Sequence, residues 1–407
     1  MELDILFLGR LFPREKEAEI KAKMKTGMQD AANALQWNII DGLEANDCGR
    51  IKILNYLPID SYPRGYTDSR IEQFAFAHTD RYAAEDLNVG CTNRSIVKQF
   101  VNIRPFKREV KRWVRRRDGA KKVLVAYTAS AMFLSLAKYA KRLDPTVETC
   151  CIIADIPEFA SARHLTGVRK LYNTYLTNRC AALYEHIDKF VLLTRQMADK
   201  LRIKAPFIVI EGIAPTVGTV RDSALSDQYK GEKYILYSGT LNCQFGIIEL
   251  LDAFETIPDR DVRLMICGFG EAETIIRERM TKDARIIFPG RVDRAEVLAL
   301  QRGAAVLVNP RQNNEEFTKY SFPSKTMEYL SSGVPLVAYK LDGIPDEYDD
   351  YIHYVPDNSP ASLTGEISYV LGMSAEEREK FGAEARRFVT ENKNNVVQGK
   401  KILDFIR

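Results

Sequence analysis

The stretch that decides the fold runs from Asn309 to Glu347 and reads NPRQNNEEFTKYSFPSKTMEYLSSGVPLVAYKLDGIPDE. A polar lead-in comes first, then a helical segment from Ser324 to Gly333, and then a short apolar strand. Ser324 is expected to cap this helix, because its side-chain oxygen can accept hydrogen bonds from the free amides of the first turn. Gly333 suits the end of a helix. A loop followed by an open helix N-terminus forms a place where an anion can bind.

The totals favour a chain of two domains. Its 407 residues, 45% of them apolar, exceed what one hydrophobic core usually supports. The seven cysteines include no pair with metal-ligand spacing, and the four histidines are scattered, so we expect no metal and no cofactor. The first residues, MELDILFLG, predict a strand rather than a signal peptide. No run of apolar residues is long enough to cross a membrane. A cytoplasmic protein is therefore expected.

Short apolar runs alternate with helical patterns along the whole chain. Runs that are apolar on both faces are typical of parallel sheets covered by helices. The polar segment 214–231 lacks this pattern and is predicted to be a linker. We therefore predict two doubly wound α/β domains, at 1–213 and 232–390, and a C-terminal helix at 391–407 that can pack back on the first domain. The predicted strands are Ile5–Leu8, Ile51–Asn55, Val123–Ala126, Cys150–Ile153, Phe190–Leu193, Phe207–Ile210, Tyr234–Ser238, Arg263–Cys267, Arg285–Phe288, Ala305–Val308, Pro335–Ala338 and Ile352–Val355.

Polar residues follow two of the predicted strands in the first half. Gly9 and Arg10 end the first strand, and Asp155 follows the strand at 150–153. Ligands of doubly wound sheets bind at the carboxyl ends of the strands, so these three residues are predicted to lie on the acceptor side of a cleft. Asn33 and Gln36, in the helix after the first strand, could face the same cleft. Alternatively, Asp155 only caps the next turn.

The segment Arg104–Lys122 is strongly basic, since ten of its nineteen residues are Lys or Arg. Phe106, Val110 and Trp113 recur in it at helical spacing. Such a helix, with a Trp on its apolar side, can lie on an anionic membrane surface. The alternative is a helix docked on its own domain with a solvated basic face. Nucleic-acid binding is not expected, because one basic helix lacks the fold of a nucleic-acid reader.

Motifs in the second half resemble those of family 4 retaining glycosyltransferases. They are Ser238–Leu241 (SGTL), Cys267–Glu271 (CGFGE), Phe288–Val292 (FPGRV) and Ser321–Glu328 (SFPSKTME). The order and spacing of the motifs match those of this family over roughly 188–395. Among relatives, the motifs resemble those of bacterial capsule and exopolysaccharide enzymes. The resemblance implies the GT-B fold, in which two Rossmann-like doubly wound domains face each other across a cleft, with the nucleotide sugar bound by the second.

The residues in these motifs have chemistry that suits a nucleotide sugar. Glycines at strand-to-helix turns let backbone amides approach phosphates, and a cation is needed where the leaving diphosphate develops charge. Lys325 is the first candidate for that cation, and the resemblance places Glu328 on the ribose hydroxyls. The predicted donor-binding residues are Gly239, Thr240, Gly268, Gly270, Arg291, Arg311, Ser321, Phe322, Ser324, Lys325 and Glu328.

The chain departs from the family pattern at two places. Tyr320 stands where a carboxylate near the donor sugar is expected, and Glu315 or Glu316 could replace it. Thr240 and Phe245 stand where many relatives carry an Arg and a Lys that contact the diphosphate. Lys325, Glu316 and Asp155 are accordingly the candidate catalytic residues of this chain.

The implied function is metal-independent, retaining hexosyl transfer (EC 2.4) from a nucleoside diphosphate sugar to a glycan or lipid-linked acceptor in bacterial surface polysaccharide synthesis. A peripheral contact with the inner face of the membrane through Arg104–Lys122 accompanies this hypothesis. Two alternatives stay open: a nucleotide-sugar epimerase on the same fold, or a non-catalytic binding subunit of a polysaccharide complex.

Overall fold

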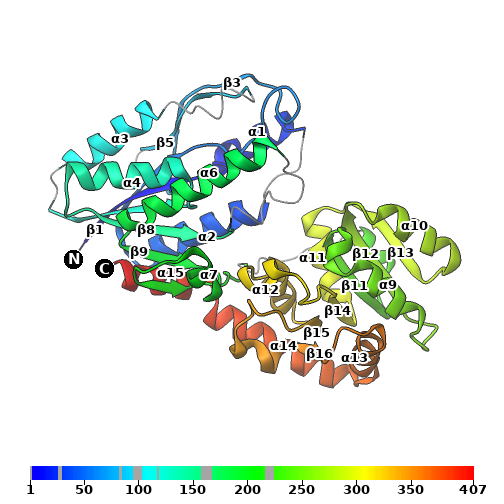
Figure 1. Cartoon of the computed structure of the whole chain (residues 1–407). Coiled ribbons are helices and arrows are strands. Elements are labelled where there is room, and N and C mark those ends of the chain that lie inside the picture. The colour runs from blue at the N-terminus through cyan, green and yellow to red at the C-terminus, as the bar shows by residue number, and fades with distance from the viewer. Residues whose placement is uncertain are drawn as a thin grey trace. The chain divides into compact units, whose positions relative to one another are not determined.

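The computed structural model describes residues 2–25, 30–81, 85–94, 103–116, 119–156, 167–215 and 224–407. The chain divides into two compact units, each of which is considered by itself (Figure 1). Unit 1 comprises Met1–Glu211 together with Asn395–Arg407, and unit 2 comprises Gly212–Asn394. Within the predicted linker, 216–223 lie outside the described residues, and the short helix α8 (Ala224–Gln228) follows them.

Unit 1 is built on a sheet with the strand order β10-β9-β8-β7-β1-β2-β5-β4. Its neighbouring strands pair in parallel, except for the antiparallel pair of β4 and β5. The chain adds strands outward from β1 in one direction and then from β7 in the other, so the topological switch point lies between β1 and β7. The strands are β1 (Leu3–Gly9), β2 (Gly49–Asn55), β4 (Phe74–Phe76), β5 (Asp86–Asn88), β7 (Lys121–Tyr127), β8 (Glu148–Ile153), β9 (Lys189–Leu192) and β10 (Phe207–Val209), with a separate pair β3 (Arg70–Ile71) and β6 (Cys91–Thr92).

The helices of unit 1 form two packed groups, α3 with α4 and α6, and α2 with α15 (Figure 1). Because β1 and β7 are buried along nearly their whole length, both faces of the sheet need such a cover. The helices are α1 (Glu17–Lys23), α2 (Asp30–Ala45), α3 (Arg104–Arg115), α4 (Ala131–Leu143), α6 (Val168–Leu183), α7 (Gln196–Leu201) and α15 (Asn395–Ile406).

The C-terminal helix α15 packs on α2 through two glycines. A Cβ atom added to Gly42 would lie 2.1 Å from the carbonyl oxygen of Asn395, and one added to Gly399 would lie 2.4 Å from the carbonyl carbon of Gly42. Any larger side chain at either position would force the helices apart. Asn46 secures the crossing by donating a hydrogen bond to the Val396 carbonyl oxygen at 2.8 Å. The chain therefore returns to unit 1 after completing unit 2.

Unit 2 is a six-stranded, wholly parallel sheet with the order β13-β12-β11-β14-β15-β16. This is the strand order of a Rossmann-like sheet, and its switch point lies between β11 and β14. The strands are β11 (Tyr234–Thr240), β12 (Arg263–Phe269), β13 (Ile286–Gly290), β14 (Val306–Asn309), β15 (Leu336–Tyr339) and β16 (His353–Val355).

Each face of the unit 2 sheet has its own hydrophobic core. Ile235 and Tyr237 point into the core under α9, α10 and α13, whereas Tyr234 and Leu236 point into the core under α11, α12 and α14. This alternation follows from the two-residue period of a strand. The helices are α9 (Ile247–Glu255), α10 (Glu273–Lys282), α11 (Arg294–Gly303), α12 (Ser324–Ser332), α13 (Pro360–Gly372) and α14 (Ala375–Asn392).

The predicted doubly wound α/β architecture is confirmed. All twelve strands expected from apolar runs are present, with ends that differ by at most two residues. The short strands between 70 and 92 were not predicted, because two or three residues are too few to show a periodic pattern.

Candidate functional site

The switch point of unit 2 brings the ends of β11 and β14 side by side. Gly239 and Thr240 end β11, and Arg311 lies two residues after β14. α12 then begins at Ser324, after the 3₁₀ turn η6 (Glu316–Tyr320). Ligands of doubly wound sheets bind at this position, so the topology gathers the predicted donor residues where a site is expected.

Lys325 lies across the end of β11. Its Nζ atom donates a hydrogen bond to the Tyr237 hydroxyl at 3.1 Å and lies 4.7 Å from the centroid of that ring. Gly239 makes room for it, because a Cβ atom at this position would lie 1.5 Å from Nζ, and the φ of 151° is one that other residues rarely adopt. Burial lowers the pKa of Lys325 to about 8, and Arg311 adds to this effect, whereas Glu328 opposes it.

The Lys325 ammonium is thus a partly desolvated cation that makes no ion pair within the described residues. A buried charge without a counterion is costly, and an incoming diphosphate would remove that cost. Lys325 therefore has the position and the charge that a phosphate-binding residue needs.

Glu328 follows Lys325 by one helical turn and is held by a residue that the sequence did not single out. The fully buried Gln301, on α11, donates from Nε2 to Glu328 Oε1 at 2.6 Å and to Ser238 Oγ at 3.1 Å. Arg294 lies 3.6 Å from the other carboxylate oxygen. The carboxylate is therefore oriented while it keeps acceptor capacity for a ligand hydroxyl. The sequence feature that could have identified Gln301 is its place directly after two apolar residues, Ala299 and Leu300, which are buried with it.

Arg311 extends the positive charge of the site. Its guanidinium lies 4.4 Å from the Phe317 ring centroid and 5.3 Å from that of Phe245, and Nη2 donates to Ser321 Oγ at 3.1 Å. Phe245 is one of the two positions where relatives carry a cation. In this structure Arg311, on the neighbouring loop, places its guanidinium over the Phe245 ring.

The start of α12 differs from the prediction. Ser324 is the first helical residue and is exposed, and the residue that precedes the helix is Pro323, so Ser324 is not the cap. Pro323 occupies that place because its fixed φ, here −66°, suits a helix entry. Phe322 is buried and packs at 5.4 Å, between ring centroids, against Tyr348. Gly333 ends the helix in the left-handed conformation as expected, with a φ of 82°.

The remaining predicted donor residues lie at the ends of β12 and β13. Gly268 pairs in register with Gly239, and Gly270 follows the end of β12. Arg291 is exposed after β13 and lies 5.2 Å from the centroid of Phe269, an aromatic ring that is 49% exposed. An exposed aromatic side chain next to a cation could contact a nucleobase, which extends the predicted set by Phe269.

Glu316 and Tyr320 are partners in the turn before α12. Tyr320 donates a hydrogen bond from its hydroxyl to Glu316 Oε1 at 3.3 Å. Tyr320, which stands where a carboxylate was expected, thus contacts Glu316, which was proposed to replace that carboxylate. Glu316 is exposed, so its charge remains accessible from solvent.

In unit 1, buried amide side chains fix the loop that follows β1. Gln36 accepts a hydrogen bond from the Arg10 amide and donates one to its carbonyl oxygen, each at 2.7 Å. Asn55 does the same for Leu11 at 2.9 Å, and Asn33 accepts from the Phe12 amide at 2.9 Å. Gln36 and Asn33 therefore bind the backbone of this loop, and the expectation that they face a cleft is wrong.

The side chains of Arg10 and Asp155 lie at the carboxyl ends of β1 and β8. Burial lowers the pKa of Arg10, while Tyr56 and Tyr127 favour its charge. Asp155 is exposed, yet the surrounding chain desolvates its carboxyl enough to raise the pKa above the ordinary value. The alternative role of Asp155 as the cap of the next turn falls outside the described residues, since 157–166 are not among them.

The basic segment forms α3 over Arg104–Arg115, and its apolar side is not available for insertion. Trp113 is only 4% exposed and Phe106 is fully buried, with its ring 6.2 Å from that of Tyr56. The buried Glu109 pairs with Lys52 and Arg112. The apolar face of α3 is therefore covered within unit 1, and the alternative, a docked helix with an exposed basic face, describes its packing.

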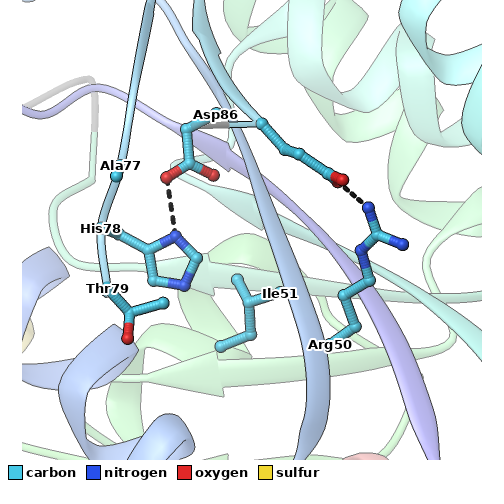
Figure 2. A pocket seen from close by; sticks show the side chains of 7 residues that line it. Arg50, Ile51, Ala77, His78, Thr79 and Asp86 are labelled. Carbon is cyan, nitrogen blue, oxygen red and sulfur yellow. Dashed lines mark hydrogen bonds and ion pairs between the residues drawn. The ribbon is translucent and has the colours of Figure 1, made fainter. Parts of the chain in front are cut away.

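A small pocket in unit 1 lies at the opposite end of the sheet, near the start of β2 (Figure 2). Its polar groups are already paired. His78 contacts Asp86 through Nδ1 at 2.6 Å and Glu44 through Nε2 at 3.2 Å, and Arg50 pairs with Glu85. Burial by itself lowers the pKa of His78, but hydrogen bonds to the two carboxylates outweigh it and raise the pKa to about 9. This cluster joins α2 to the β4–β5 hairpin.

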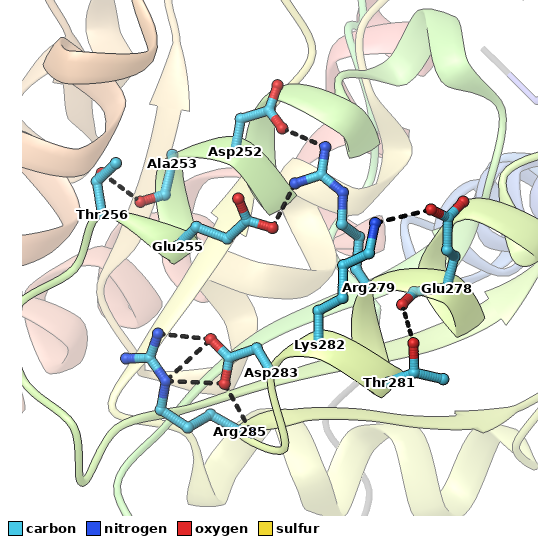
Figure 3. A network of polar contacts seen from close by, with 10 residues as sticks. All are labelled: Asp252, Ala253, Glu255, Thr256, Glu278, Arg279, Thr281, Lys282, Asp283 and Arg285. Carbon is cyan, nitrogen blue, oxygen red and sulfur yellow. Dashed lines mark hydrogen bonds and ion pairs between the residues drawn. The ribbon is translucent and has the colours of Figure 1, made fainter.

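Charged residues on α9 and α10 form a second paired network (Figure 3). Arg279 bridges Asp252 and Glu255, and Arg285 makes a two-pronged contact with Asp283. These pairs link neighbouring elements of unit 2. Across the described residues there is no group of three metal-ligating side chains, and no helix there is long and apolar enough to span a bilayer.

Comparisons with known proteins agree with this geometry. Residues 221–388, which make up most of unit 2, match the family model of glycosyl transferases group 1. This match includes β11, α11 and α12 and thus the whole arrangement around Lys325. No curated protein matches the chain.

Solved structures resemble the chain over its full length. Sucrose-phosphate synthase from Thermosynechococcus elongatus is 14% identical with a TM-score of 0.63, covering 99% of this chain and 98% of that one. The protein HepE from Anabaena, in complex with UDP, is 13% identical with a TM-score of 0.63, covering 100% and 99%. A trehalose-6-phosphate protein from E. coli bound with UDP-2-fluoro glucose is 11% identical with a TM-score of 0.62, covering 99% and 98%. These likenesses confirm the predicted GT-B fold.

Proposed function

We propose that this chain, a GT-B protein with a glycosyltransferase group 1 domain, transfers a sugar with retention from a nucleoside diphosphate sugar to a glycan or lipid-linked acceptor in bacterial surface polysaccharide synthesis. The observation that carries the proposal is the arrangement at the switch point of unit 2. There Lys325, lying against Gly239, offers an uncompensated cation, and one turn later Glu328 offers an oriented carboxylate. A diphosphate needs a cation and a ribose needs a hydrogen-bond acceptor, and this arrangement offers both.

In the proposed reaction, the bond between the anomeric carbon and the leaving phosphate oxygen breaks while a bond to the acceptor oxygen forms on the same face. Lys325 and Arg311 stabilise the negative charge that develops on the diphosphate. A leaving phosphate oxygen takes the acceptor proton, so no separate protein base is needed. Glu328 binds the ribose hydroxyls, and the glycine turns supply backbone amides to the phosphates. Asp155 and Glu316 are proposed to bind the acceptor and the donor sugar, respectively.

The first test is a thermal-shift screen against nucleoside diphosphates and their sugars. A ligand that binds only the folded protein stabilises it in proportion to the logarithm of its concentration over its dissociation constant. UDP is the first probe, because two structural neighbours hold UDP or a UDP-sugar analogue, and GDP, ADP and dTDP complete the panel. If none of these stabilises the chain, the non-catalytic alternative gains and the enzymatic proposal fails.

The second test follows the sugar. With donor and a bacterial lipid-linked glycan extract, we expect transfer of labelled sugar, an NMR coupling constant that shows retention at the anomeric carbon, and activity unchanged by EDTA. Incubating the protein with donor alone distinguishes a transferase from an epimerase. An epimerised sugar formed without acceptor would contradict the transferase. Inversion, or loss of activity with EDTA and recovery with a divalent cation, would refute retention or metal independence.

Membrane contact from the cytoplasmic side is a further part of the proposal. Arg108 and Arg112 project from α3 with side chains 63% and 67% exposed, so attraction to anionic lipid would be electrostatic and screened by salt. Co-sedimentation with phosphatidylglycerol vesicles at low salt, compared with phosphatidylcholine vesicles, tests it. Equal recovery with both vesicles would remove the membrane from the proposal.

A further inference from the structure

The switch point of unit 1 also holds a buried cation. β1 and β7 are neighbours there, and the strands on either side of them run outward in opposite chain order. Arg10 directly follows β1, and Tyr127 is the last residue of β7. A ligand of a doubly wound sheet binds outside the carboxyl ends of the strands at such a point. Arg10 and Tyr127 therefore flank the place where the topology of unit 1 provides for a ligand.

The Arg10 side chain is largely buried without a counterion. Its Nε atom is buried and has no hydrogen-bond partner, and its guanidinium makes no ion pair with any described residue. The loop that carries it is rigid, because Gln36 binds both the amide and the carbonyl group of Arg10. A guanidinium does not give up its proton, so this site keeps a positive charge in a place where an unpaired charge is unfavourable.

Tyr127 completes the polar surface. It is 4% exposed, and its hydroxyl is buried without a hydrogen-bond partner among the described residues. Its neighbourhood includes both the Arg10 guanidinium and the Asp155 carboxyl, since both act on its ionisation. A cation and a hydroxyl that have no partner among the described residues, one directly after β1 and one at the end of β7, match the donors that an oxyanion needs. Asp155, next to them, suits a neutral sugar hydroxyl.

We propose that Arg10 and Tyr127 form a subsite for a negatively charged oxyanion group, a phosphate or a carboxylate, carried by the acceptor. This inference rests on the proposed function, because it names the class of acceptor that the transferase would use. It narrows the acceptor from any glycan to one that bears a charge close to the attacking hydroxyl.

The test uses the full chain with saturating nucleoside diphosphate, so that the phosphate site at Lys325 is filled. Thermal unfolding is followed while inorganic phosphate, glucose 1-phosphate, glucuronate, an isoprenyl monophosphate or neutral glucose is titrated. The phosphate and uronate arms separate the two oxyanions, and the isoprenyl arm separates a lipid-linked from a soluble acceptor. The variants are Arg10→Met, Arg10→Lys and Tyr127→Phe, and Arg70→Met is the matched control, an exposed arginine of the same unit.

We expect at least one anion, but not glucose, to stabilise the wild type and the Arg70→Met control. Arg10→Met should abolish this response, Arg10→Lys should retain part of it, and Tyr127→Phe should weaken the anion about 3- to 10-fold, the effect of one hydrogen bond. Without ligand, Arg10→Met should raise the unfolding midpoint by about 2–4 °C, because it removes an unpaired buried charge.

Three results would overturn the proposal. They are an equal response to glucose and to the anions, an anion response that survives Arg10→Met, or a ligand-free Arg10→Met protein that unfolds at a lower temperature or does not fold. The last result would show that Arg10 has an internal structural role. Because nucleotide stabilisation is recorded in the same experiment, failure of this inference is distinct from failure of the proposed function. If the nucleotide does not bind, the anion titration is repeated in a Lys325→Met background.

Discussion

Replacing Lys325 with methionine should make unit 2 more stable and its nucleotide binding weaker. Burial lowers the pKa of Lys325 from 10.5 to about 8, a difference of about 2.5, and each pKa unit corresponds to about 1.36 kcal/mol. The charged lysine therefore costs the folded protein about 3 kcal/mol at neutral pH. Methionine has a similar length and no charge to desolvate, and the Tyr237 hydroxyl keeps its hydrogen bond to the Thr240 carbonyl oxygen at 2.8 Å.

The pH dependence of the wild-type stability shows in which direction the Lys325 charge acts. Because the folded-state pKa lies below the unfolded one, the unfolded chain binds more protons between about pH 8 and pH 10.5. This lysine therefore makes the wild type gain stability as the pH rises through that window, and the cost is fully present below about pH 8. Nucleotide affinity should move the opposite way, since the ammonium that binds the diphosphate is lost as the pH rises through 8.

Denaturant unfolding at pH 7.0 and 9.5 measures the first effect, and calorimetric titration with the stabilising nucleoside diphosphate measures the second. Lys325→Met should gain about 3 kcal/mol at pH 7, gain less at pH 9.5, and bind the nucleotide about 10- to 100-fold more weakly, which is the range of a hydrogen bond to a charged group. Lys282→Met, at an exposed lysine of α10, is the control and should change neither quantity. A less stable Lys325→Met protein with unchanged nucleotide affinity would refute the assignment.

Three further predictions follow from other contacts. Gln301→Leu should weaken the nucleoside diphosphate about 10-fold in calorimetry by freeing the Glu328 carboxylate, and a 2′,3′-dideoxy analogue should be insensitive to the change; equal losses for both nucleotides would mean that Gln301 acts elsewhere. The pKa of His78, raised to about 9 from 6.5, gives stability that is complete below about pH 6.5 and is lost as the pH rises through 9, worth up to about 3 kcal/mol; in denaturant unfolding His78→Gln should lose this slope, and a persisting slope would assign it to another group. Gly42→Ala places a methyl group 2.1 Å from the Asn395 carbonyl oxygen, so it should destabilise unit 1 by about 1–3 kcal/mol and speed hydrogen exchange in α15; unchanged exchange would show that the helices can shift to fit.

The two units place a cation at corresponding points of their folds. In each sheet the cation, Lys325 or Arg10, lies at the topological switch point, is largely buried, and makes no ion pair within the described residues. In the proposed reaction a negatively charged leaving group has to be held, and Lys325 of unit 2 is the cation proposed for that role. The cation of unit 1 has no such role in the transfer of a sugar to a neutral acceptor, which is why it indicates a charged one.

The departures from the family pattern also acquire a physical meaning. Phe245 stands where the resemblance predicted a cation, and the Arg311 guanidinium lies 5.3 Å from the centroid of its ring, so a positive charge is present beside this position. Tyr320 replaces a carboxylate and contacts Glu316, which lies four residues earlier. A charged group therefore lies beside each of these two residues, Arg311 beside Phe245 and Glu316 beside Tyr320.

The amino-acid sequence alone determined the architecture of this protein. Hydrophobic periodicity and the glycine stops are local properties, so twelve strands and the helix from Ser324 to Gly333 could be predicted within one or two residues. The places of Lys325 and Glu328 in the first turns of this helix could be predicted as well, because the helix starts four residues before Glu328.

Only the tertiary structure decided how these groups are supported. Gln301 of α11 donates a hydrogen bond to Glu328 of α12, and Lys325 lies against Gly239, which is 86 residues earlier in the chain. Arg10 follows β1, whose neighbour β7 begins 111 residues after Arg10. The same limit explains why Trp113 was predicted on a membrane-facing side and is buried instead. Periodicity shows that a face is apolar, but what covers that face, and whether a charge beneath it finds a counterion, depends on how distant segments pack.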